Sequence, residues 1–108
     1  MNQADDVVSR VRALAASGQM KITQHAAQEM TAETITLDDV LDAIDNARLL
    51  EDYPDHRRGA CCLLYGTDNR GRDIHVVCTT ANPMLIIITA YLPKPPKWIS
   101  ATQRRSQP

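Results

Sequence analysis

The chain has no phenylalanine, and its aromatic residues are three tyrosines and one tryptophan among 108 residues. Its core must therefore come from leucine, isoleucine, valine, methionine and alanine. A hydrophobic fraction of 44% is enough for one globular domain of ordinary composition. We expect that domain over residues 1–98. A flexible tail over residues 99–108 should follow, because proline-rich sequence ends the patterned part of the chain.

An excess of charge of one sign is also lacking, since the formal net charge is −1. A protein with so little net charge has no general attraction for nucleic acid. Any recognition of phosphate must therefore come from local basic residues. The candidates for binding a substrate are Arg57, Arg58, Arg72 and Lys97.

Several other features are missing, and each absence excludes a class of protein. No apolar run is long enough to span a membrane, and no charged segment is followed by the apolar run of a secretory signal, so we expect neither feature. Three cysteines, two of them adjacent, do not form a disulfide framework, so we expect free cysteines in a cytoplasmic protein. The spacings typical of metal sites and the glycine-rich loop of nucleotide sites are absent, so we expect neither metal nor cofactor.

The hydrophobic spacing changes period along the chain. It predicts helices over residues 2–16 and 23–30, and a third from Thr36, where Asp39 completes a capping-box pattern. It then predicts four strands, over residues 49–53, 60–66, 72–80 and 84–91. We therefore expect an α+β fold, with two or three N-terminal helices packed on one face of a four-stranded antiparallel meander sheet.

The last predicted hairpin gathers polar residues on one face. If the turn lies at residues 81–83, His75 pairs with Thr89 and Asp73 pairs with Tyr91. Leu85 and Ile87 should continue this face, while Ile86 and Ile88 turn toward the helices. These polar residues have two interpretations: one ligand site, or an ordinary strand histidine and a strand-end tyrosine that packs with its hydroxyl in water.

The chain resembles a small bacterial family named Domain of Unknown Function 4258. The resemblance rests on "ITQHAAQEM", "ITLDDVLDAIDNARLLEDYPDHRRGACCLLYG", "GRDIHVVCTT" and "LIIITAYLPKPPKW", which follow in the family's order. It implies a relation to the RelE/ParE-like toxins and a RelE-like fold, with His25, His75 and Tyr91 at the characteristic polar positions. One departure is Glu29, where the family often has arginine, so a phosphate contact is lost there.

The resemblance and the residues together predict a metal-independent endoribonuclease of the toxin type, or a descendant of one. His75 would serve as acid or base with His25 as its counterpart, and Tyr91 would bind phosphate or stack on a base. The alternative is a non-catalytic interaction module. The expected partners are RNA, a cognate antitoxin or a second copy of the chain, and no membrane.

Overall fold

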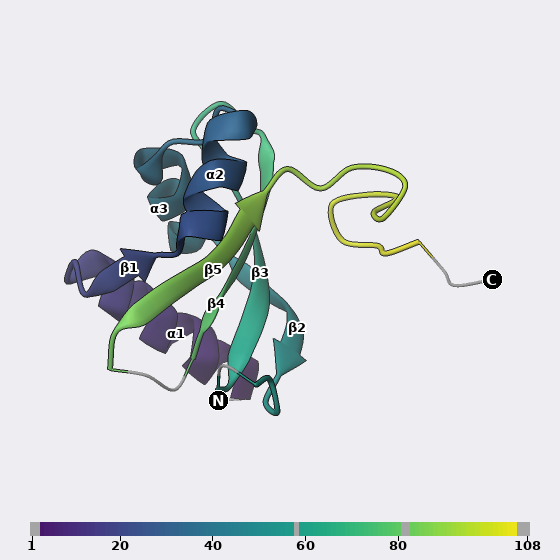
Figure 1. Ribbon diagram of the computed structural model, residues 1–108. Coiled ribbons are helices and arrows are strands. Elements are labelled where there is room, and N and C mark those ends of the chain that lie inside the picture. Colours follow the sequence, from purple (N-terminus) through teal and green to yellow (C-terminus); the bar gives the residue numbers. More distant parts are fainter. Residues whose placement is uncertain (1–2, 58, 81–82, 106–108) are drawn as a thin grey trace.

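Across residues 3–57, 59–80 and 83–105, which the computed structural model describes, five strands form one sheet and three helices cover one of its faces (Figure 1). The sheet order is β1-β5-β4-β3-β2, in which β1 is parallel to β5 and the other pairs are antiparallel. The α+β class is confirmed. The helices are α1 (Gln3–Ala16), α2 (Gln24–Ala32) and α3 (Leu37–Asp45); the strands are β1 (Met20–Ile22), β2 (Arg48–Tyr53), β3 (Cys61–Thr67), β4 (Asp73–Thr79) and β5 (Leu85–Tyr91).

The expectation of four antiparallel strands is wrong, because β1 adds a fifth and makes the sheet mixed. This strand has three residues, too few to show an alternating pattern in the sequence. Met20 pairs with Leu85, so the strand depends on a partner 65 positions further along the chain. Only the tertiary fold supplies that partner.

Side-chain caps start the second and third helices where the sequence indicates. The Thr23 hydroxyl accepts a hydrogen bond from the Ala26 N–H and donates one to the Ile88 carbonyl, so the same residue caps α2 and joins it to β5. At α3 the Thr36–Asp39 capping box is confirmed, with N–O distances of 2.9 and 3.1 Å. Both caps supply acceptors to N–H groups that the helix leaves unpaired.

The predicted register of the last hairpin is wrong by two residues at His75, and a β-bulge accounts for one of them; the other is already present beside the turn, where Cys78 pairs with Ile87 instead of Ile86. His75 pairs with Tyr91 instead of Thr89, and Val77 pairs with Thr89. The extra residue, Ile88, interrupts the ladder between Thr89 and Ile87. Between the turn and the bulge the faces of β5 are the reverse of the prediction, so Leu85 and Ile87 lie in the core under the helices and Ile88 lies on the opposite face. Beyond the bulge the predicted faces are restored, with Ala90 in the core and Tyr91 beside His75.

The core fills the space between the three helices and one face of the sheet. Helix α3 approaches β3 so closely that a Cβ at Gly66 would lie 2.0 Å from the Ala43 carbonyl oxygen. Only glycine fits at that position. The buried residues from the sheet include Leu64, Ile74, Val76 and Cys78, and those from the helices include Val11, Ala26, Val40 and Ile44.

The chain after β5 lies on the face of the sheet opposite the helices (Figure 1). We call residues 93–105 the C-terminal segment. Within it, Trp98 and Arg104 form a β-bridge, and Trp98 is 2% exposed. The carbonyl of Ala101 reaches His75 in β4, so the segment contacts the sheet well beyond residue 98.

Candidate functional site

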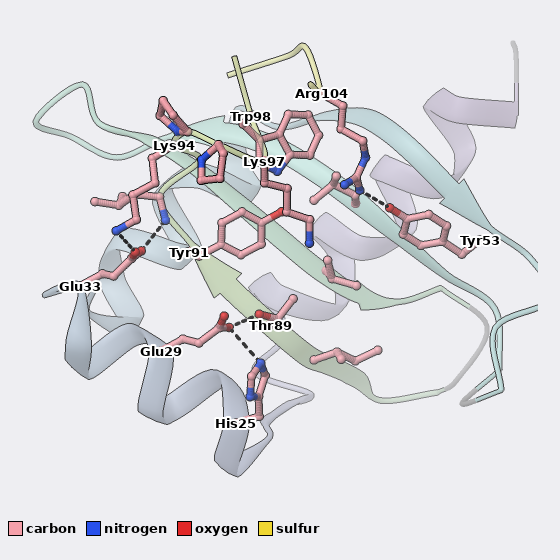
Figure 2. A pocket seen from close by; sticks show the side chains of 16 residues that line it. His25, Glu29, Glu33, Tyr53, Thr89, Tyr91, Lys94, Lys97, Trp98 and Arg104 are labelled. Atoms are coloured by element: carbon pink, nitrogen blue, oxygen red, sulfur yellow. Dashed lines mark hydrogen bonds and ion pairs between the residues drawn. The ribbon is translucent and has the colours of Figure 1, made fainter. Parts of the chain in front are cut away.

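A groove of about 610 Å³ runs between α2, β5 and the C-terminal segment (Figure 2). Its lining includes the apolar side chains of Leu63, Val77 and Ile88, and the bulge in β5 brings the last of these to the groove. An apolar lining with convergent polar groups is typical of a ligand site.

His25 and Glu29 form one wall of the groove from successive turns of α2. The imidazole Nε2 lies 3.5 Å from Glu29 Oε1, and the His25 side chain is 67% exposed. The same carboxylate accepts hydrogen bonds from the Thr89 hydroxyl and the Ala90 N–H (Figure 2). Glu29 therefore joins the histidine to β5, and this is a structural role that an arginine at the same position could not perform, because arginine has no acceptor.

His75 and Tyr91 lie side by side on β4 and β5, and their contacts fix the position of the protons. His75 Nε2 lies 2.6 Å from the Ala101 carbonyl oxygen, which only accepts, so Nε2 carries the hydrogen. In the neutral ring Nδ1 is then an acceptor. The Tyr91 hydroxyl, 3.2 Å away, donates to it.

Burial shifts both groups toward their neutral forms. The pKa of His75 is lowered because the side chain is desolvated, although the Ala101 carbonyl and Glu51 partly oppose this shift. Burial likewise raises the pKa of Tyr91. His75 has no exposed surface, since Trp98 packs edge-on with its ring centroid 4.4 Å away. Tyr91 lines the groove, so it is the end of this pair that a ligand meets.

Most of the positively charged side chains in the groove form ion pairs with carboxylates. Lys94 lies 2.7 Å from Glu33, and Arg104 holds Glu51 through two hydrogen bonds of 2.7 and 2.8 Å. The hydrogen bond from Arg104 lowers the pKa of Glu51, and burial raises the pKa of the neighbouring Tyr53 to about 12. Within the described residues Lys97 has no such carboxylate.

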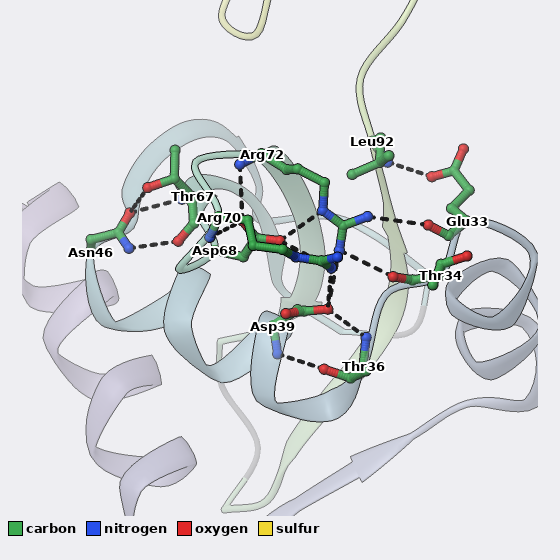
Figure 3. Close-up of polar contacts among 10 residues, drawn as sticks. All are labelled: Glu33, Thr34, Thr36, Asp39, Asn46, Thr67, Asp68, Arg70, Arg72 and Leu92. Atoms are coloured by element: carbon green, nitrogen blue, oxygen red, sulfur yellow. Dashed lines mark hydrogen bonds and ion pairs between the residues drawn. The ribbon is translucent and has the colours of Figure 1, made fainter.

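The predicted arginines do not line the groove. Arg72 bonds to Asp68 within the turn after β3 (2.7 Å) and joins this turn to Asp39 in the first turn of α3 (3.1 Å) (Figure 3). Hydrogen bonds from Arg72 lower the pKa of Asp68 although burial opposes the shift, so this arginine has a structural role. Arg57 is exposed in the turn between β2 and β3, and Arg58 lies outside the described residues.

The structure thus brings His25, Tyr91 and Lys97 to one groove, with His75 behind Tyr91. Their functional roles stay predictions. Sequence reasoning named Glu29 and Thr89 but not the contact between them, and it did not include Trp98 and Arg104 in the site. The four-residue spacing of His25 and Glu29 on one helix already places these two side chains on the same face. No local pattern indicates Thr89 as a partner of Glu29, or Trp98 and Arg104 as neighbours of the site.

Among residues 3–57, 59–80 and 83–105, no cluster of three or more histidine, cysteine, aspartate or glutamate side chains could hold a metal ion. In the same part of the chain, no helix combines the length and the apolar character needed to cross a membrane.

The fold and the groove define a small α+β domain in which histidine, tyrosine and lysine side chains meet on the side of the sheet away from the core. The chain belongs to the family described as Domain of unknown function (DUF4258), whose match covers residues 22–92, more than half of the chain. His25, His75 and Tyr91 fall within the matched range, whereas Lys97, Trp98 and Arg104 follow it. No curated protein and no solved structure matches the chain.

Proposed function

We propose that the protein is a toxin-like endoribonuclease that cleaves RNA without a metal ion, on a scaffold related to the RelE/ParE-like toxins. The observation that carries the proposal is the pair formed by Tyr91 and His75 in the wall of a groove that His25 also lines. Cleavage through the ribose 2′-oxygen requires one group to take a proton and another to supply one. The groove offers both.

The Tyr91–His75 pair is the base in this proposal. As the 2′-oxygen attacks the phosphorus, its proton passes to the Tyr91 oxygen, and the Tyr91 proton passes to His75 Nδ1. One proton thus moves from the ribose to the imidazole, which becomes an imidazolium that still donates through Nε2 to Ala101. His75 therefore acts without touching the substrate.

His25 is the acid that protonates the leaving 5′-oxygen. Its ring is exposed to the groove and is oriented by Glu29. The Lys97 ammonium, without a carboxylate of its own in the described part of the chain, stabilises the charge that develops on the phosphate oxygens.

A purified-protein assay on single-stranded RNA in the presence of a chelator tests this proposal. We expect fragments that end in a 2′,3′-cyclic phosphate and a 5′-hydroxyl. Tyr91→Phe and His25→Ala should each slow cleavage by about 10²-fold or more, the usual contribution of a positioned acid or base.

The matched controls are Tyr65→Phe and Gln24→Ala. The first removes a hydroxyl that bonds to Asp73 outside the groove, and the second changes an exposed residue of α2. Both should cleave at the wild-type rate. Undiminished cleavage by Tyr91→Phe would remove the proposed base, and intact RNA with the wild-type protein would remove the enzymatic proposal.

A second candidate is a non-catalytic interaction module. Two observations favour it: the groove cations Lys94 and Arg104 are already neutralised, and the chain has a net charge of −1. An antitoxin segment or a second copy would then add a strand at β1 or β2, the outermost strands of the sheet. Expression in cells separates the two candidates. Growth arrest that is relieved by His25→Ala or His75→Gln favours the enzyme, and normal growth with intact RNA favours the module.

A further inference from the structure

Glu29 uses one of its two carboxylate oxygens within the protein and leaves the other to the groove. Its Oε1 accepts hydrogen bonds from the Thr89 hydroxyl and the Ala90 N–H, and it lies 3.5 Å from His25 Nε2. Among residues 3–57, 59–80 and 83–105, no group donates a hydrogen bond to Oε2. The side chain lines the groove and is 29% exposed, so Oε2 is an acceptor that a ligand can use.

An apolar surface adjoins this carboxylate. Val77 pairs with Thr89 across β4 and β5, and Ile88 is the bulge residue that precedes Thr89. Val77 and Ile88 both line the groove and are partly exposed. Because Thr89 bonds to Glu29, the carboxylate stands at the edge of this apolar floor. A flat ring laid on the floor would bury its face there and present its edge to Glu29.

The edge of such a ring must donate hydrogen bonds, because a carboxylate oxygen only accepts them. Among the RNA bases, guanine places two donors side by side, N1–H and N2–H₂, and the lone pairs of one oxygen can accept from both. Adenine and cytosine set a ring nitrogen that accepts beside their amino group. The N3–H of uracil lies between two carbonyl oxygens, which the carboxylate repels. The chemistry of the edge therefore favours guanine.

We infer that Glu29, Val77 and Ile88 form a guanine-binding subsite of the groove, in which Glu29 selects the base. The choice of a nucleobase as the ligand rests on the proposed function, since Lys97 there binds a phosphate in the same groove. The groove volume of about 610 Å³ is in the range of sites that hold molecules of nucleotide size. Glu29 also orients His25, so the selected base lies beside the group that protonates the leaving oxygen.

Binding of single-stranded DNA measures the subsite without cleavage, because DNA lacks the attacking 2′-hydroxyl. A thymidine pentanucleotide is compared with three versions that carry guanine, adenine or cytosine at the middle position, so that the phosphate charge is constant. Affinities are taken from the amide shifts of the ¹⁵N-labelled protein. We expect the guanine version to bind most tightly, by about tenfold or more over the all-thymidine version, whose N3–H is flanked by carbonyl oxygens as in uracil.

Glu29→Gln gives a result that a purely structural role would not produce. The Ala90 N–H still requires an acceptor, so the amide oxygen takes the place of Oε1 and the amide NH₂ takes the place of Oε2. A donor then faces the base, and the variant should bind the all-thymidine version at least as tightly as the guanine version. Asp38→Asn makes the same chemical change at an exposed residue of α3 outside the groove and should keep the preference for guanine.

The inference is overturned if the wild-type protein binds none of the oligonucleotides, if guanine is not the preferred base, or if Glu29→Gln folds and still prefers guanine. Its failure is distinguishable from failure of the proposed function. A preference for guanine that depends on Glu29, without cleavage of RNA, removes the enzyme and keeps the subsite. RNA cleavage together with equal affinity for all the oligonucleotides keeps the enzyme and removes the subsite.

Discussion

His75 connects stability and chemistry at the scale of single residues. Both ring nitrogens are hydrogen-bonded, to Tyr91 and to Ala101, and the side chain has no exposed surface. An imidazole in this position is favoured in its neutral form, since water no longer solvates the charge. The residue therefore links folding to pH whether or not it takes part in catalysis.

We expect the stability of the protein to decrease in mild acid. The pKa of His75 is lowered in the folded state from its ordinary value of 6.5, so below that pH the unfolded chain binds a proton that the folded chain does not. The free energy of unfolding should be level above about pH 7 and should fall below about pH 6.5, by at most about 1.4 kcal/mol per pH unit for one proton. Urea unfolding at a series of pH values measures this.

His75→Gln is the comparison variant for that experiment. It should be less stable than the wild type at neutral pH, yet its stability should change less between about pH 7 and pH 5. If the free energy of unfolding changes equally with pH in the two proteins, His75 is not the group responsible for the loss of stability in acid.

At the scale of elements, the C-terminal segment covers the face of the sheet that carries His75. Trp98 and Ala101 close over His75, and the Arg104–Glu51 ion pair fastens the segment to β2. The ion pair is partly exposed, with 40% of the Arg104 side chain accessible to solvent. Exposed ion pairs contribute little to global stability, so their effect should be mainly local.

Arg104→Ala should loosen the segment while leaving the domain folded. We expect the free energy of unfolding to fall by about 1 kcal/mol or less, while the fluorescence of Trp98 becomes more sensitive to quenching by acrylamide. Arg105→Ala changes the neighbouring arginine, which no carboxylate holds within the described residues, and is the matched control. Equal quenching in the two variants would mean that the ion pair does not hold the segment.

For the whole molecule, the charge distribution limits how the proposed RNA substrate would bind. The net charge is −1, and within residues 3–57, 59–80 and 83–105 the groove pairs Lys94 with Glu33 and Arg104 with Glu51. Binding through one or two phosphates releases few counterions. If the proposed function holds, recognition of RNA depends on the shape and hydrogen bonds of the groove more than on long-range attraction.

The salt dependence of binding measures this directly. For a single-stranded oligonucleotide, the logarithm of the association constant should fall against the logarithm of salt concentration with a slope of about −0.7 to −1.4, as expected for one or two phosphate contacts. Lys97→Met should make the slope shallower by about 0.7. Lys21→Met, which changes an exposed lysine on β1 outside the groove, should leave the slope unchanged. A slope several times steeper in the wild type would indicate a larger basic surface than the groove provides.

Local sequence was sufficient to predict much of the fold and part of the candidate site. The three helices follow from apolar spacing and from the caps at Thr23 and Thr36, and the longer strands follow from alternation bounded by turn residues. The shared face of His75 and Tyr91 also follows from the two-residue period. These features depend on interactions within a few residues or within one hairpin.

The features that only the tertiary structure determines depend on contacts between residues that are distant in the chain. Strand β1 exists because β5 lies beside it, the bulge at Ile88 places that residue in the groove, and Trp98 and Ala101 cover His75 because the segment returns to the sheet. Arg72, a candidate for binding phosphate by its charge alone, is instead engaged by Asp68 and Asp39. Side-chain type and spacing determine which elements form, whereas long-range packing determines which polar atoms remain available to a ligand.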